Sequence, residues 1–140
     1  MLQRELPGQE GLLVGLVSAE RVVDFLARHE CVTRVYFPGR FPRDAADAEV
    51  YARQCAAPGA MIAFEIDGGE TEAFAVLDAL RLIKLAVSLG GTESLAEHPA
   101  TMTHADVPGE VKAHRGISPG LIRISVGVEN VDDLIADLGQ

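Results

Sequence analysis

The chain is poor in basic and aromatic residues. Its 140 residues include no tryptophan. There are 12 Lys and Arg residues and 21 Asp and Glu residues, which gives a formal net charge of −9. Nucleic acids and anionic membrane surfaces are bound through clustered Lys and Arg, and the basic residues here are scattered. We therefore expect neither nucleic acid nor a membrane surface as a partner.

Long apolar runs and cysteine pairs are also missing. No stretch is apolar enough to span a bilayer, and the first residues are too polar for a secretion signal, so we expect a cytoplasmic protein. Cys31 and Cys55 lie far apart, which predicts two buried or partly buried free thiols and no disulfide framework. The four histidines are His29, His98, His104 and His114. They lack the spacing of metal ligands, so no metal site is expected.

What is present is typical of one globular domain, with 48% apolar residues. We read residues 1–11 as a polar lead-in and 12–140 as the domain. Apolar spacing predicts helices over 18–30, 42–57, 71–85, 106–114 and 131–138, and strands over 32–37, 60–66 and 121–126. This order favours the α+β class, with a small, mostly antiparallel sheet and helices on one face.

Particular side chains mark the expected helix ends and turns. Ser18 and Asn130 are the predicted N-caps of the first and last helices. Gly90–Gly91 lacks a phosphate-loop pattern and predicts a tight turn. We place Glu97, together with Glu93, on a solvated face, and expect His98 and His104 to fix an irregular loop by hydrogen bonds.

Arg123 is the most informative single residue, because it lies in the middle of the strand predicted at 121–126. An unpaired charge among apolar neighbours is costly, and a guanidinium matches a planar carboxylate. The residues alone leave two interpretations open. Arg123 is either a structural residue, paired with a nearby Asp or Glu or facing outward on an amphipathic strand, or it binds a carboxylate ligand.

Two segments carry a resemblance to a known family. Residues 88–104 read SLGGTESLAEHPATMTH and residues 121–127 read LIRISVG. Together they resemble the carboxy-terminal domain of the trans-sulfuration (Cys/Met metabolism) enzymes that use pyridoxal phosphate, closest to the methionine γ-lyase and cystathionine γ-lyase type. The resemblance covers about residues 15–140 and implies part of a fold-type I pyridoxal-phosphate enzyme.

The resemblance also assigns roles to residues. It implies that Arg123 grips the α-carboxylate of an amino-acid substrate, that Ser88 helps to hold it, and that Thr103 lines the pocket. Val87 stands where cystathionine γ-lyases and γ-synthases carry a Glu, which favours a methionine γ-lyase type of specificity.

The chain has two lysines, Lys84 and Lys112. The family's chemistry begins with a Schiff base on a lysine, and neither lysine has the Ser-x-Thr-Lys surroundings of that residue. The resemblance thus implies that the amino-terminal cofactor domain is absent from this chain. It also implies that this chain contains no catalytic residue. Pyridoxal phosphate would belong to the parent enzyme, a C–S lyase or sulfhydrylase acting on a sulfur-containing amino acid, and would not bind this chain alone.

Two alternatives stay open from the sequence. The chain could be a stand-alone module that binds an amino-acid carboxylate without chemistry, or an oligomerisation domain without a ligand. Removing a domain from its partner leaves an apolar face exposed, which predicts self-association into a homo-oligomer.

Overall fold

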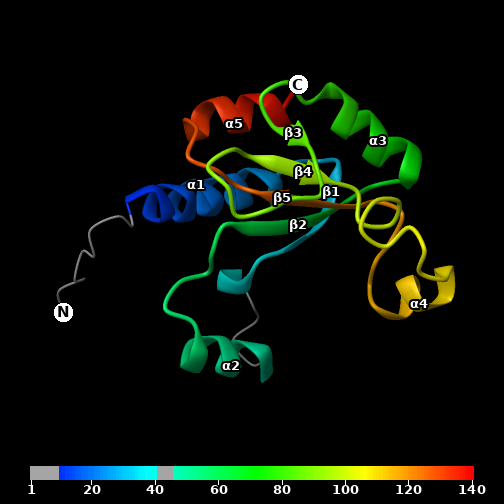
Figure 1. The fold of residues 1–140 in the computed structure, drawn as a ribbon, viewed down its shortest axis with the longest axis horizontal. Helices are drawn as coiled ribbons and strands as arrows, with labels where there is room; N and C mark the ends of the chain where they lie inside the picture. Colours follow the sequence, from blue (N-terminus) through cyan, green and yellow to red (C-terminus); the bar gives the residue numbers. More distant parts are fainter. Residues whose placement is uncertain (1–9, 41–45) are drawn as a thin grey trace.

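The structure is a computed structural model that describes residues 10–40 and 46–140. The described residues form α-helices and strands that alternate along most of the chain (Figure 1). The helices are α1 (Glu10–Leu26), α2 (Ala46–Gln54), α3 (Glu70–Ala79), α4 (Gly109–His114) and α5 (Val131–Leu138), with a 3-10 turn, η1, at Pro38–Arg40. The strands are β1 (Val32–Tyr36), β2 (Met61–Ile66), β3 (Lys84–Leu85), β4 (Leu95–Glu97) and β5 (Leu121–Ser125).

The strands form one sheet in the order β1-β2-β5-β4-β3. All neighbouring pairs are antiparallel except β3 and β4, which are parallel. The last strand of the chain, β5, therefore occupies the centre of the sheet. The predicted α+β class with a mostly antiparallel sheet is confirmed.

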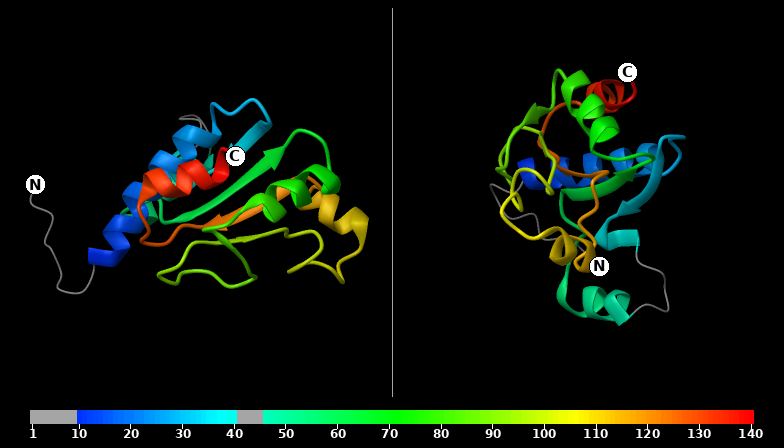
Figure 2. Two further views of the ribbon diagram at one scale, coloured as in Figure 1. Left: turned by 90° about the horizontal axis from the view of Figure 1, so that it is seen from above. Right: turned by 90° about the vertical axis from the view of Figure 1, so that its right-hand side faces the viewer.

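One face of the sheet carries the apolar core. Ile62 and Phe64 of β2, and Ile122 and Ile124 of β5, are each at most 1% exposed, because alternate residues of a strand point to the same face. Helices α1, α3 and α5 supply the other half of this core, and they lie together on one side of the sheet (Figures 1 and 2). Helices α2 and α4 have no buried residue and lie apart from this layer.

The prediction of the first helix was wrong at its start. Helix α1 begins at Glu10, eight residues before Ser18, which is 4% exposed within the helix and does not cap it. The apolar residues at 12, 13, 14, 16 and 17 continue the helix toward its amino end. Of the predicted lead-in, Glu10 and Gly11 belong to α1, and residues 1–9 lie outside the described residues.

The helix predicted over 71–85 is shorter than expected. Helix α3 ends at Ala79, and Leu85 belongs to strand β3. The chain turns there because the carboxylate of Asp137 on α5 accepts hydrogen bonds from the backbone N–H groups of Arg81, Leu82 and Ile83, at 2.8, 3.0 and 2.9 Å. A distant side chain thus ends this helix.

The remaining expectations had mixed outcomes. Asn130 caps α5, accepting a hydrogen bond of 2.8 Å from the N–H of Asp132, as predicted. Helix α2 lies within the predicted range 42–57, whose first residues fall outside the described part. Cys31 and Cys55 are free thiols, but the prediction of burial was wrong, because both are exposed beyond the ends of α1 and α2.

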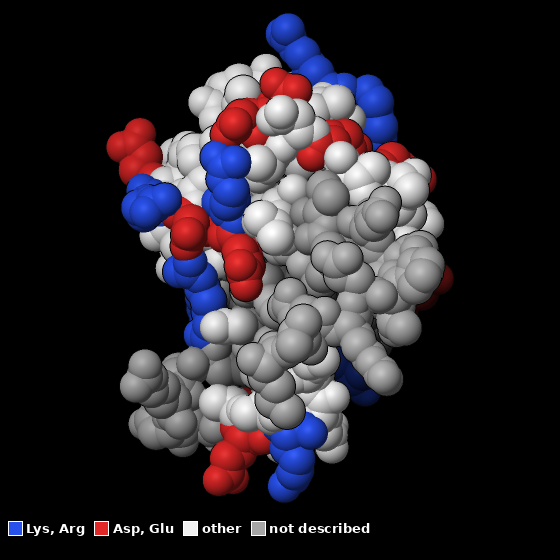
Figure 3. Space-filling view, turned by 90° about the vertical axis from the view of Figure 1, so that its left-hand side faces the viewer, with Lys and Arg blue, Asp and Glu red and all other residues white. Residues whose placement is uncertain are grey.

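The surface carries mixed charge. On the face shown in Figure 3, acidic and basic side chains lie among one another over the described residues. None of the described helices is long and apolar enough to cross a membrane.

Candidate functional site

Arg123 lies on the face of the sheet opposite to the core. Ile122 and Ile124 point toward the helices, so the side chain between them points away from the core. Its partners across the ladders are Ala63 on β2 and Glu97 on β4. The segment between β3 and β4 and the segment after β4 cover this face, leaving the Arg123 side chain 22% exposed.

The guanidinium of Arg123 forms an ion pair with Glu97. Nη1 of Arg123 lies 2.8 Å from Oε1 of Glu97, and the glutamate side chain is only 1% exposed. The prediction that Glu97 lies on a solvated face was wrong. Strand β4 places it directly opposite Arg123, where the buried carboxylate is compensated by the positive charge.

Thr103 reaches Arg123 through this glutamate. Its hydroxyl donates a hydrogen bond of 3.3 Å to Oε1 of Glu97 and lies 2.9 Å from Nδ1 of His104. The predicted pocket residue therefore contacts the acidic partner of the arginine, and His104 helps to fix the loop, as expected.

Ser88 contacts Arg123 by its backbone. Nη2 of Arg123 donates hydrogen bonds of 3.2 Å to the carbonyl oxygens of both Val87 and Ser88. The turn that follows has Gly90 at a positive φ of 74°, as the prediction of a tight turn requires, and its N–H donates to Oγ of Ser125 on β5 at 2.9 Å. The structure thus brings Ser88, Thr103 and Arg123 to one place, with the side chain of Val87 54% exposed beside it.

Among the described residues, two buried polar atoms at this site have no hydrogen-bond partner. They are Nε of Arg123 and Oε2 of Glu97. A guanidinium has five N–H donors in a planar fork, and the contacts described above engage Nη1 and Nη2. The Nε–H group is therefore left without a partner among the described residues, although it lies beneath the surface of the site.

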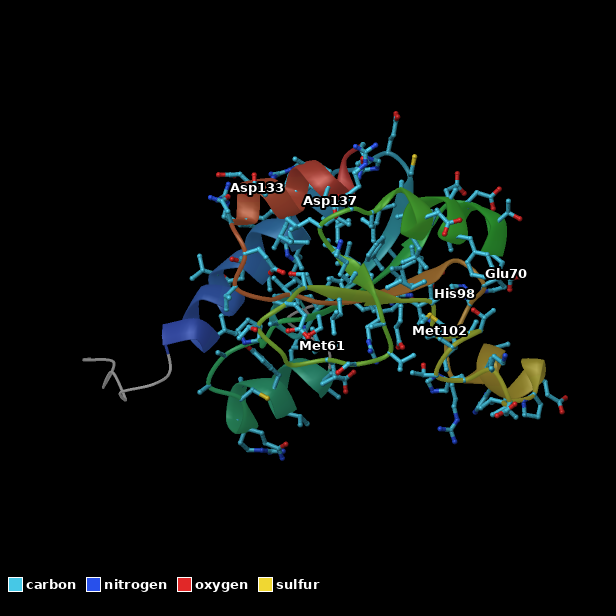
Figure 4. The ribbon with its side chains drawn as sticks, turned by 45° about the horizontal axis from the view of Figure 1, so that its top comes forward. Met61, Glu70, His98, Met102, Asp133 and Asp137 are labelled. Carbon is cyan, nitrogen blue, oxygen red and sulfur yellow. The ribbon has the colours of Figure 1, made fainter. Side chains whose placement is uncertain are left out.

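His98 anchors the loop that follows β4. Its ring is fully buried, with Nε2 2.7 Å from the carbonyl oxygen of Pro119 and Nδ1 2.8 Å from Oγ1 of Thr101. A carbonyl can only accept, so Nε2 carries the proton that it donates. The N–H of His98 also donates to Sδ of Met102 (Figure 4). The predicted structural role of His98 is confirmed.

Other buried polar contacts escaped the sequence reasoning. Asp137 is 8% exposed on α5 (Figure 4). Burial raises the pKa of this carboxyl, but the hydrogen bonds from Ile83, Arg81 and Leu82 outweigh that effect, so the pKa is lowered overall. The buried Ser94 donates its hydroxyl to Glu129 at 2.7 Å. Hydrophobic periodicity carries no signal for such pairs, since each depends on the tertiary position of its partner.

The lysines do not fit a Schiff-base role. Nζ of Lys84 donates to the carbonyl oxygen of Arg81, and Nζ of Lys112 donates to that of Ala100 at 2.7 Å. These partners differ from those of Arg123. Neither lysine therefore lies beside Arg123 as a free amine that could carry pyridoxal phosphate.

Comparisons with known proteins agree with the resemblance in the sequence. The sequence profile of the family described as Cys/Met metabolism PLP-dependent enzyme matches residues 16–140. The L-methionine γ-lyase of Porphyromonas gingivalis is 50% identical over 123 residues, which cover 86% of this chain and 30% of that protein. The cystathionine γ-lyase of Dictyostelium discoideum is 43% identical over 123 residues, covering 88% of this chain and 31% of that protein.

Solved structures show the same relationship. A cystathionine γ-lyase from Micromonospora echinospora superimposes with a TM-score of 0.84 at 38% identity, covering 93% of this chain and 33% of that one. A cystathionine γ-synthase from Xanthomonas oryzae pv. oryzae, solved in complex with cystathionine, gives a TM-score of 0.83 at 44% identity, covering 92% and 33%. The chain spans about a third of the length of these relatives. It belongs to the Cys/Met metabolism family of pyridoxal-phosphate-dependent enzymes.

Proposed function

We propose that this chain is the substrate-carboxylate domain of a pyridoxal-phosphate lyase or transferase that acts on a sulfur-containing amino acid. In this proposal Arg123 binds the α-carboxylate, and Ser88 and Thr103 line the same site. The cofactor and its lysine are supplied by a part of the enzyme that this chain does not contain, so the chain alone is inactive.

The observation that carries the proposal is the state of the Arg123 guanidinium. It is anchored by Glu97 and by two backbone carbonyls, its side chain stays 22% exposed, and its Nε–H has no partner among the described residues. Donors fixed in this way bind a planar anion without first losing conformational freedom. The name of the Porphyromonas gingivalis relative and the apolar Val87 beside the site favour methionine over cystathionine as the substrate.

A chimera tests the proposal. The chain is joined behind the first two thirds of the Porphyromonas gingivalis L-methionine γ-lyase, in place of the matching last third. We expect the chimera to cleave L-methionine. Arg123→Lys should lower its kcat/KM about 10- to 100-fold, since one hydrogen bond to a charged group contributes about 1.5–3 kcal/mol.

The matched control is Arg28→Lys, at an exposed arginine after α1, which should leave kcat/KM unchanged. The absorbance of bound cofactor verifies that each variant chimera is loaded. A loaded, active chimera whose kcat/KM is insensitive to Arg123→Lys would contradict the proposed role of this residue.

A stand-alone binding module is the second candidate. The engagement of both lysines with backbone carbonyls fits this candidate as well as the first, because neither needs a Schiff-base residue in this chain. Titration calorimetry of the chain with methionine, homocysteine and cystathionine separates the two candidates. A stand-alone module should bind one of them with micromolar affinity, whereas an isolated carboxylate domain should give no heat at micromolar concentrations.

A further inference from the structure

The carboxylate of Glu97 is buried, and removing this charge from water costs free energy that an apolar side chain in its place would not cost. Its side chain is 1% exposed, and the residue opposite it across the β4–β5 ladder is Arg123. Burying an ion pair rarely stabilises a fold more than apolar residues of the same shape would. The pair therefore calls for an explanation other than the stability of the sheet.

Glu97 makes the strongest of the contacts that orient Arg123. It approaches Nη1 to 2.8 Å, while the neutral carbonyls of Val87 and Ser88 lie 3.2 Å from Nη2. A charged hydrogen bond is shorter and stronger than a neutral one. The plane of the guanidinium is thus fixed mainly by Glu97 on one side and completed by the carbonyls on the other.

Glu97 is itself held in place. The hydroxyl of Thr103 donates to the same Oε1 that contacts Arg123, and the imidazole of His104 lies beside that hydroxyl. The segment that carries both residues is anchored by the buried ring of His98. A chain of contacts therefore runs from this loop through Glu97 to the guanidinium.

We propose that Glu97 is the positioning residue of Arg123, and that Thr103 acts through Glu97 rather than on the ligand. The inference rests on the proposed function, because it assumes that the ligand of Arg123 is the carboxylate of an amino acid. Glu97 keeps the guanidinium in one orientation and balances its charge when no carboxylate is bound. In that orientation the Arg123 side chain stays 22% exposed to a ligand carboxylate, while its Nε–H is buried without a partner among the described residues.

The test follows the Arg123 Nε–H signal by NMR in the full 140-residue chain. In the wild type this buried N–H should exchange slowly with water. Glu97→Gln keeps the size of the side chain and removes its charge, so exchange should become about tenfold faster. Glu97→Asp retains the charge and should restore part of the protection. Thr103→Val should accelerate exchange about two- to threefold, because Glu97 itself remains.

The amide signals of β2 and β5 report whether each variant keeps its fold. A Glu97→Gln protein with an intact sheet and an unchanged Nε–H exchange rate would overturn the proposal. If Glu97→Gln does not fold, Thr103→Val decides in its place, and an unchanged exchange rate in that variant would likewise overturn it.

Sodium acetate, titrated against sodium chloride at equal ionic strength, separates this inference from the proposed function. Acetate should shift the Nε–H signal of the wild type, and more strongly in Glu97→Gln, where the guanidinium charge is uncompensated. If the Nε–H responds to the Glu97 variants and not to acetate, positioning stands and the carboxylate site fails. If acetate shifts the wild type and Glu97→Gln equally, with unchanged exchange rates, the carboxylate site stands and positioning fails.

Discussion

The two faces of the sheet are built on different principles. The face toward α1, α3 and α5 is filled by apolar side chains such as Phe64 and Ile122, each at most 1% exposed. The opposite face holds a buried ion pair, Arg123–Glu97, beneath segments that lack regular structure. The apolar face supplies stability, and that rigid support lets the polar face keep a charged group with a free donor.

The largest loss of stability is expected from a substitution on the apolar face of the sheet. Phe64→Ala removes a buried ring from the centre of the core, and the free energy of unfolding should fall by about 3–5 kcal/mol. Urea denaturation measures this change. The matched control is Phe74→Ala, at a ring that is 38% exposed on α3. A loss at position 74 as large as that at position 64 would contradict the placement of the core.

The ion pair on the polar face should behave differently from the core. Glu97→Leu leaves Arg123 without its charged partner and should cost about 2–3 kcal/mol, somewhat below the usual range of about 3–5 because the arginine is partly exposed. Combining it with Arg123→Met should return the stability to within about 1 kcal/mol of the wild type. Additive losses in the double variant would show that the two residues are not energetically coupled, which would contradict the ion pair.

Asp137 holds the segment between α3 and β3 in place, and this contribution to stability should depend on pH. Its pKa is lowered in the folded protein, so its contribution is fully present above its ordinary value of 3.8 and is lost as the pH falls through the lower folded value. Asp137→Asn should therefore cost about 1–2 kcal/mol at neutral pH. The difference from the wild type should shrink on acidification.

Denaturant unfolding at several pH values measures this difference, with Asp133→Asn, at an exposed residue of the same helix, as the matched control. A gap between wild type and Asp137→Asn that widens as the pH falls below 3.8 would contradict the lowered pKa.

The smallest effect should come from the cap of α5. Asn130→Ala removes the acceptor for the N–H of Asp132 and should cost about 1 kcal/mol. Asn130→Asp retains a capping oxygen and should cost only a few tenths. Thermal unfolding of the two variants measures the difference, and equal stabilities would show that the cap contributes nothing.

The two faces also differ in how far the sequence predicts them. The alternation of Ile62, Phe64 and Ile66 and the apolar stripe of α5 depend on local spacing, and the corresponding elements were predicted correctly. Strand β4 is only three residues long and is defined by its pairing with β5, so no local sequence pattern predicts it. The burial of Glu97 follows from that register, which explains why a residue predicted to be solvated became the partner of Arg123.

The site was foreseen only in part. Family motifs named Ser88, Thr103 and Arg123, and the structure brings these residues together. The contacts that join them were not predictable, because Ser88 contributes a backbone carbonyl and Thr103 contacts Glu97. A motif records which residues recur, whereas the choice between backbone and side-chain contacts is made by the path of the loop.

An NMR titration of the chain with L-methionine tests most directly whether the polar face of the sheet receives a carboxylate. L-methioninol, which carries a hydroxymethyl group in place of the carboxylate, is the comparison ligand. We predict that millimolar methionine shifts the signals of Ser88, Thr103 and Arg123, and that methioninol leaves them in place. Equal shifts with both ligands, or shifts confined to other parts of the chain, would contradict the claim.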